Sequence, residues 1–79
     1  MAIQTVLLVE DDATLSEVVG SMLTLAGYRA VVIAEHALIP YAIASSRPRC
    51  VIMDGELSAS GQNRSWADAA AIRRVYPEI

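Results

Sequence analysis

Three short apolar segments most constrain how this chain can fold. They are nearly uninterrupted, and the stretches between them have helical spacing. The segments cover residues 2–9, 29–34 and Cys50–Met53. Apolar runs without alternation are typical of parallel strands that are covered on both faces. Strands that alternate with helices form parallel pairs through right-handed crossovers. The sequence therefore predicts an α/β fold built on a doubly wound parallel sheet.

The first intervening stretch has the spacing of an amphipathic helix. Its apolar residues recur three and one positions apart, at Leu15, Val18, Val19, Met22, Leu23 and Ala26. Asp12 or Thr14 can cap the start of this helix, and Gly27 can supply the left-handed residue that ends it.

Two further helices are predicted after the second and third apolar segments. The helix over residues 37–46 requires Pro40 to lie in the first turn. The helix over residues 65–76 ends before Pro77, and Glu78-Ile79 could open a fourth strand.

Composition narrows the class of protein. Hydrophobic residues make up 54% of the 79 residues and charged residues 19%, which excludes a disordered tail. The net charge is −3 and no basic run occurs, so we expect no direct nucleic-acid binding. No apolar run approaches the roughly 20 residues of a membrane span, and the start carries no basic leader. With Cys50 as the single cysteine, these features predict a cytoplasmic protein without an intramolecular disulfide or a membrane partner.

Acidic residues follow two of the predicted strands directly. Glu10, Asp11 and Asp12 come after the first strand, and Asp54 and Glu56 follow the third. In parallel α/β sheets, ligands bind beyond the carboxyl ends of the strands. Carboxylates brought together there repel one another unless a cation neutralises them, and oxygen ligands suit Mg²⁺. Zinc lacks a ligand set, because the chain has one His and one Cys.

Four sequence segments together resemble a known family. They read VLLVEDD at residues 6–12, AGY at 26–28, VIMD at 51–54 and IRR at 72–74. In this order and spacing the chain resembles the receiver domain of bacterial two-component response regulators, over essentially all of residues 1–79. That family has a flavodoxin-like fold of five βα units with strand order 2-1-3-4-5. The resemblance implies a partial receiver with order 2-1-3, whose fourth and fifth units, with their phosphate-contacting Ser/Thr and Lys, are absent.

The resemblance also implies a role for each acid that matches the family motif. Asp54 looks like the phosphoacceptor, which takes a phosphoryl group from a histidine kinase or a phosphotransfer protein. Glu10 and Asp11, with Asp54, look like the Mg²⁺ ligands, and the main-chain carbonyl of Glu56 matches the third protein ligand. The implied function is a signalling switch that changes an output surface, with at most self-catalysed phosphoryl transfer as enzymatic activity. The chain departs from the family at Ser58, where a Pro is usual.

Two other functions remain open on the sequence. A degenerate receiver would bind partner proteins without phosphorylation. The segment Asp54-Gly55-Glu56-Leu57-Ser58 also loosely resembles the start of a haloacid-dehalogenase-type phosphatase, which forms an aspartyl phosphate on Mg²⁺. Acyl-phosphate formation on Asp54 separates the receiver from the binding module, and turnover of phosphate monoesters would indicate the phosphatase.

Several single residues receive structural interpretations. We expect Cys50 to be a buried small hydrophobic residue, His36 to lie in a loop or at a helix start, and Trp66 to anchor a core or an interface. Arg73 and Arg74 should lie on a solvated helix face. With strand order 2-1-3, the third strand is an edge strand. We therefore expect the chain to form a homodimer through that edge, to exchange elements with a neighbour, or to belong to a longer polypeptide.

Overall fold

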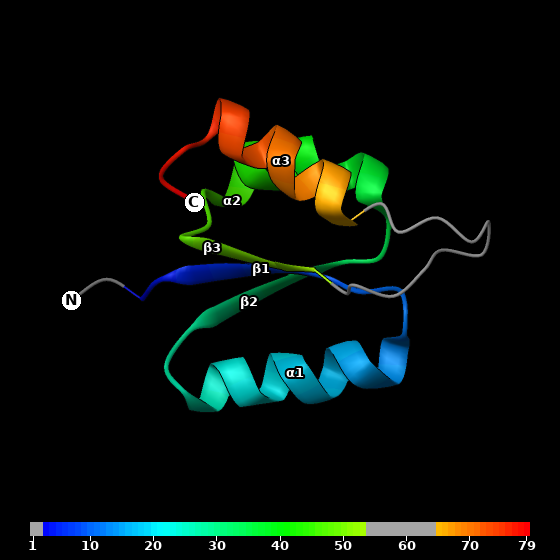
Figure 1. The fold of residues 1–79 in the computed structure, drawn as a ribbon. Coiled ribbons are helices and arrows are strands. Elements are labelled where there is room, and N and C mark those ends of the chain that lie inside the picture. The colour runs from blue at the N-terminus through cyan, green and yellow to red at the C-terminus, as the bar shows by residue number, and fades with distance from the viewer. Residues whose placement is uncertain (1–2, 54–64) are drawn as a thin grey trace.

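The computed structural model describes residues 3–53 and 65–79, with side chains from residue 69 onward in the second range. Strands and helices alternate along the chain (Figure 1). In order, the elements are β1 (Thr5–Val9), α1 (Ala13–Leu25), β2 (Arg29–Ile33), the 3₁₀ helix η1 (His36–Leu38), α2 (Ile39–Ser46), β3 (Cys50–Met53) and α3 (Ser65–Val75). No helix in this part of the chain is long and apolar enough to cross a bilayer.

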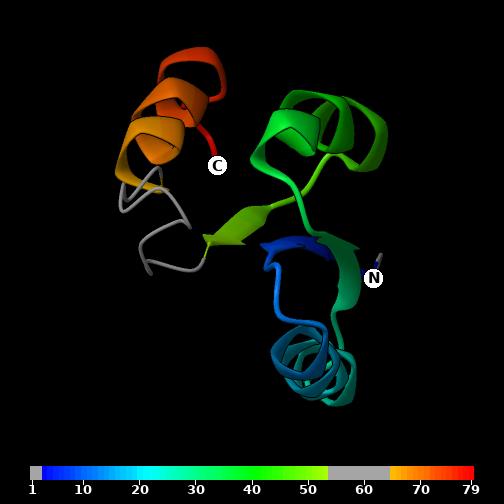
Figure 2. The same cartoon turned by 90° about the vertical axis from the view of Figure 1, so that its right-hand side faces the viewer.

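The three strands form one parallel sheet in the order β2-β1-β3. Thr5 of β1 is in register with Arg29, and Val9 is in register with both Ile33 and Met53. Helix α1 covers one face of the sheet, and α2 and α3 cover the other (Figures 1 and 2). The predicted α/β fold and the strand order 2-1-3 are confirmed, and the arrangement is consistent with a partial flavodoxin-like fold.

The core lies between the central strand and the helices α2 and α3. Leu7 and Val9 are 0% and 2% exposed, and they point to this face because side chains alternate along a strand. They pack in one cluster with four residues of the two helices, Ile39, Ala42, Ile43 and Ile72. Val6 and Leu8 point to the opposite face, toward α1, and are also buried. Burial of β1 on both faces explains its uninterrupted apolar run.

Both predicted ends of the first helix are confirmed. Asp12 caps α1 because its carboxylate accepts a hydrogen bond from the main-chain N–H of Leu15, at 3.0 Å. At the other end, Gly27 has a φ of 94°, a left-handed conformation that favours glycine. The N–H of Tyr28 donates to the carbonyl of Leu23 at 2.9 Å, which completes a Schellman motif.

Two Gly→Ala substitutions in this region should change stability in opposite directions. A Cβ at Gly27 or at Gly20 meets nothing within 4 Å, so steric contact plays no part in either. Gly27→Ala should cost about 1 kcal/mol, because its positive φ disfavours any L side chain. Gly20→Ala, inside α1, should stabilise by up to about 1 kcal/mol through helix propensity. Urea unfolding curves of the two variants test this, and a loss of stability at both positions would contradict it.

The apolar stripe predicted for α1 is only partly covered, which corrects the sequence interpretation. None of the residues of α1 is buried, and Leu15, Val18 and Met22 are 44%, 52% and 63% exposed. The helix packs mainly on β2, with Val19 and Leu23 half-buried. Periodicity identified the helix correctly, but it could not show that the described sheet leaves one flank of the stripe uncovered.

The second helix and the turn before it agree with the sequence-based prediction, with one difference. The predicted helix over residues 37–46 begins as η1 and continues as α2, and Pro40 lies in the first turn of α2 as required. His36 starts η1, as predicted. Arg47 ends α2 in the left-handed conformation, with a φ of 47°.

Two predictions at β3 and at the end of the chain are wrong. Cys50 is exposed rather than buried, because its register with Val6 turns it to the α1 face at the sheet edge, which α1 does not cover. Glu78 and Ile79 do not open a fourth strand: the chain turns after α3, and the N–H of Ile79 donates to the carbonyl of Tyr76 at 3.1 Å. Ile79 instead packs against the core cluster. Arg73 and Arg74 are exposed as predicted, and the side chain of Trp66 lies outside the described residues.

Candidate acidic site at the carboxyl end of the sheet

The strand ends that should carry the site lie side by side. Val9 is paired with Ile33 on one side and with Met53 on the other, so all three strands end at the same level. The chain then leaves β1 through Glu10, Asp11 and Asp12 and enters α1. This is the carboxyl edge of the sheet, at the end where ligands bind in open α/β folds.

Glu10 is the most constrained of the three acids. Its main-chain N–H donates to the carbonyl of Ile33 at 3.0 Å, which extends the β1–β2 ladder by one bond. The residue is 6% exposed, and its Oε1 accepts a hydrogen bond from the N–H of Asp12 at 3.0 Å. A buried carboxylate is costly without hydrogen bonds, so this contact helps to hold Glu10 in place.

The other two acids divide into a structural residue and an accessible one. Both Asp11 and Asp12 are exposed. The Asp12 carboxylate is used in capping α1, where it binds the N–H of Leu15. Asp11 lies between the buried Glu10 and the capping Asp12. The pair predicted to bind Mg²⁺, Glu10 and Asp11, is therefore adjacent at the sheet edge, while Asp12 has a separate structural role.

The other half of the predicted site lies outside the described part of the chain. Asp54 and Glu56 follow residue 53, and the described residues resume at Ser65. In residues 3–53 and 65–79, no group of three or more His, Cys, Asp or Glu side chains is arranged to hold a metal ion. The described part thus supplies two of the predicted ligands and the paired ends of β1 and β3.

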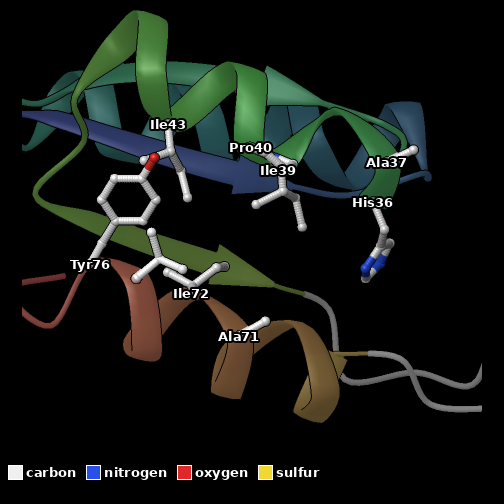
Figure 3. Close-up of a pocket in the computed structure, with 9 residues that line it drawn as sticks. His36, Ala37, Ile39, Pro40, Ile43, Ala71, Ile72 and Tyr76 are labelled. Atoms are coloured by element: carbon white, nitrogen blue, oxygen red, sulfur yellow. The ribbon is translucent and has the colours of Figure 1, made fainter.

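A second feature, an apolar cleft between the two helices on the core side, was not predicted. Its volume is about 370 Å³, and α2 and α3 form its two walls. Ile39 and Ile43 face Ile72 and Tyr76 across it, and His36 lies at one end (Figure 3). The i,i+4 spacing of Ile39 and Ile43, and of Ile72 and Tyr76, was a usable signal for two facing apolar stripes. Nothing in the sequence indicated that the stripes would stay partly separated.

Comparison with known proteins identifies no relative of this chain. No family model matches it. No curated protein and no solved structure matches it either. Function is therefore inferred from the residues and from the geometry of the sheet.

Proposed function

We propose that this chain forms the first three βα units of a receiver domain of a two-component response regulator and accepts a phosphoryl group on Asp54. The observation that supports the proposal best is the register of the central strand, which pairs Val9 with Met53. Because of this register, β1 and β3 end at the same level. In the sequence, Glu10 and Asp11 follow the first of these strands and Asp54 follows the second. Buried Glu10 and exposed Asp11 are already held there.

The proposed reaction is transfer of a phosphoryl group from a phosphohistidine. A carboxylate oxygen of Asp54 attacks the phosphorus atom, and a phosphorus–oxygen bond forms as the phosphorus–nitrogen bond breaks. The imidazole of the donor leaves with the electron pair, and Asp54 becomes an acyl phosphate. The donor is a histidine kinase or a phosphotransfer protein, which places the reaction in the cytoplasm.

The proposal includes a Mg²⁺ ion, and the described donors fit it. Glu10 and Asp11 offer carboxylate oxygens at one strand end, the ligand type that Mg²⁺ prefers. Asp54 and the main-chain carbonyl of Glu56 are the other proposed ligands. When bound, the ion supplies positive charge that offsets repulsion between the carboxylates and phosphoryl oxygens.

Chemical phosphorylation tests the proposal without knowledge of the cognate kinase. The chain is incubated with acetyl phosphate and Mg²⁺, and intact mass is followed at early times. We expect a mass increase of one phosphoryl group that hydroxylamine removes, as it does for acyl phosphates. A chain that stays unlabelled would favour the phosphorylation-independent binding module. Steady hydrolysis of phosphate monoesters would favour the phosphatase.

Mg²⁺ should also stabilise the fold, and Asp11→Asn should remove most of this effect. A ligand that binds only the folded state stabilises it by RT ln(1 + [L]/Kd), about 1.4 kcal/mol at ten times Kd. For a domain of this size, that corresponds to a rise in Tm of roughly 5–10 °C. Thermal melts with and without Mg²⁺ measure the shift. Asp12→Asn is the matched control and should keep the shift, since Asn caps a helix as well as Asp does. No shift in the wild-type chain would contradict the metal site.

A further inference from the structure

The amino end of the sheet carries a second cleft, whose lining is more polar than that of the cleft between α2 and α3. Its volume is about 930 Å³. Residues from the start of β1, from the turn between α2 and β3 and from the turn after α3 line it, and they include Thr5, Arg47, Arg49 and Glu78. The strands begin at this end, so the cleft is separate from the acidic site at the carboxyl end.

The main chain fixes the positions of two arginines in this cleft. Arg47 ends α2, where its N–H donates to the carbonyl of Ile43 at 2.9 Å. Arg49 is held to the central strand, because its N–H donates to the carbonyl of Thr5 at 2.8 Å. Pro48 lies between them and is buried, and its ring restricts φ. The two arginine side chains are exposed, but they leave from defined points of the backbone.

A third arginine adds positive charge at the same level of the sheet. Arg29 of β2 is in register with Thr5, on the side of β1 that is away from Arg49. Residues in register project from the same face of a parallel sheet, so Arg29 and Thr5 share the face that α2 and α3 cover. Neighbouring strands lie about 4.8 Å apart, which places the Cα atoms of Arg29 and Arg49 roughly 10 Å apart across Thr5.

The positive charge of this end is only partly neutralised. Among the described residues that line the cleft, Glu78 is the only acid. In residues 3–53 and 65–79, Glu78 forms no ion pair with Arg47 or Arg49. Three arginines and one glutamate leave an excess of two positive charges at this end of the sheet (3 − 1 = 2). Such a local excess attracts anions.

Arg47 keeps a backbone conformation that glycine would adopt at a lower cost. Its φ is 47° and its ψ is 61°, in the left-handed region that disfavours L side chains. Glycine is the usual residue in this conformation at the end of a helix. A positive side chain interacts favourably with the carbonyl end of α2, which offsets part of the cost. Residues held in such conformations cluster at functional sites, which suggests a use for the guanidinium group.

We propose that Arg47 and Arg49 bind the phosphate group of a small molecule at the amino end of the sheet, where Arg29 raises the positive potential. Guanidinium groups match phosphate oxygens with pairs of N–H donors. A phosphate has enough oxygen atoms to accept from both arginines and from the Thr5 hydroxyl at once, whereas a carboxylate has two. Glu78 and the carbonyl end of α2 oppose the anion, so binding should be in the millimolar range. This site uses neither Mg²⁺ nor Asp54, so it is independent of the proposed phosphorylation.

Amide chemical shifts of the ¹⁵N-labelled 79-residue chain test the proposal. The chain is titrated at about pH 8, where a phosphate monoester is a dianion, with sodium phosphate and separately with glycerol 2-phosphate. Sodium chloride at matched ionic strength is the control for screening. We expect saturable shifts at Thr5, Arg47 and Arg49 with both phosphates and none with chloride. The compound that binds more tightly identifies the ligand as free phosphate or as a phosphate ester. Equal changes with chloride, or no saturable shift with either phosphate, would overturn the proposal.

Four variants separate anion binding from folding. Arg47→Gly removes one guanidinium but introduces the residue that this conformation favours, so phosphate binding should weaken roughly two- to fivefold while Tm does not fall. Glu78→Gln should strengthen binding, because it removes the opposing carboxylate. Arg49→Gln should weaken binding like Arg47→Gly. Arg74→Gln is its matched control, since Arg74 is exposed on α3 and does not line the cleft. Unchanged binding in Arg47→Gly and Arg49→Gln, or an equal loss in Arg74→Gln, would overturn the proposal.

Discussion

Leu7→Ala should unfold a large fraction of the molecules at room temperature. Leu7 is 0% exposed in the central strand, and it packs in the core cluster against residues from both α2 and α3, among them Ile43 and Ile72. Truncating a buried leucine to alanine costs about 2–5 kcal/mol, and a rigid, fully enclosed site lies in the upper part of that range. The free energy of unfolding of a globular protein is about 5–15 kcal/mol in total, and small domains lie near the lower limit. The substitution therefore removes most of the available stability.

The same chemical change at an exposed position is the control. Leu25 ends α1 and is 88% exposed, so Leu25→Ala should change the free energy of unfolding by less than about 0.5 kcal/mol. Urea unfolding followed by circular dichroism measures both variants under one set of conditions. Equal effects of the two substitutions, or a cost below about 1 kcal/mol at Leu7, would mean that the core is not organised around β1 as described.

The secondary structure and strand order could be predicted because local and global preferences agree. The run from Val6 to Val9 is apolar at every position. Only a strand that is covered on both faces requires such a run, and this segment is the central strand of the sheet. Asp12 and Gly27 define the ends of α1 through main-chain hydrogen bonds that depend on nearby residues only. Such signals are local, so the sequence carries them in full.

Burial was harder to predict, because it depends on what lies beside each element. Cys50 has an apolar strand sequence around it, but its strand is at the sheet edge and its side chain is on the less covered face. Met22 has the correct spacing for a buried stripe, but it lies on the flank of α1 that the described sheet does not reach. The adjacent acids show the same limit. The sequence assigned Asp12 to a helix cap and Glu10 and Asp11 to one Mg²⁺ site, but it did not indicate that Glu10 is buried while Asp11 is exposed.

Asp54→Asn should abolish the phosphoryl label expected on the wild-type chain. A carboxylate oxygen is the proposed nucleophile, and the neutral carboxamide that replaces it cannot form an acyl phosphate. The substitution changes one oxygen for nitrogen and leaves the side-chain size nearly the same. We therefore expect loss of the label without loss of the fold, which circular dichroism of the unlabelled variant would verify.

A neighbouring acid provides the matched control for this experiment. Asp12→Asn makes the same chemical change at the carboxyl edge of the sheet, at a residue that caps α1 and is outside the proposed ligand set. Asparagine caps a helix about as well as aspartate, so this variant should be labelled at nearly the wild-type rate.

Both variants are treated with acetyl phosphate and Mg²⁺, followed by intact mass, and digested after borohydride reduction to locate the modified residue. A label that persists in Asp54→Asn would place the nucleophile elsewhere, and the assignment of Asp54 as phosphoacceptor would be wrong. A label lost equally in both variants would indicate that the negative charge of the edge, rather than one carboxylate, controls the reaction.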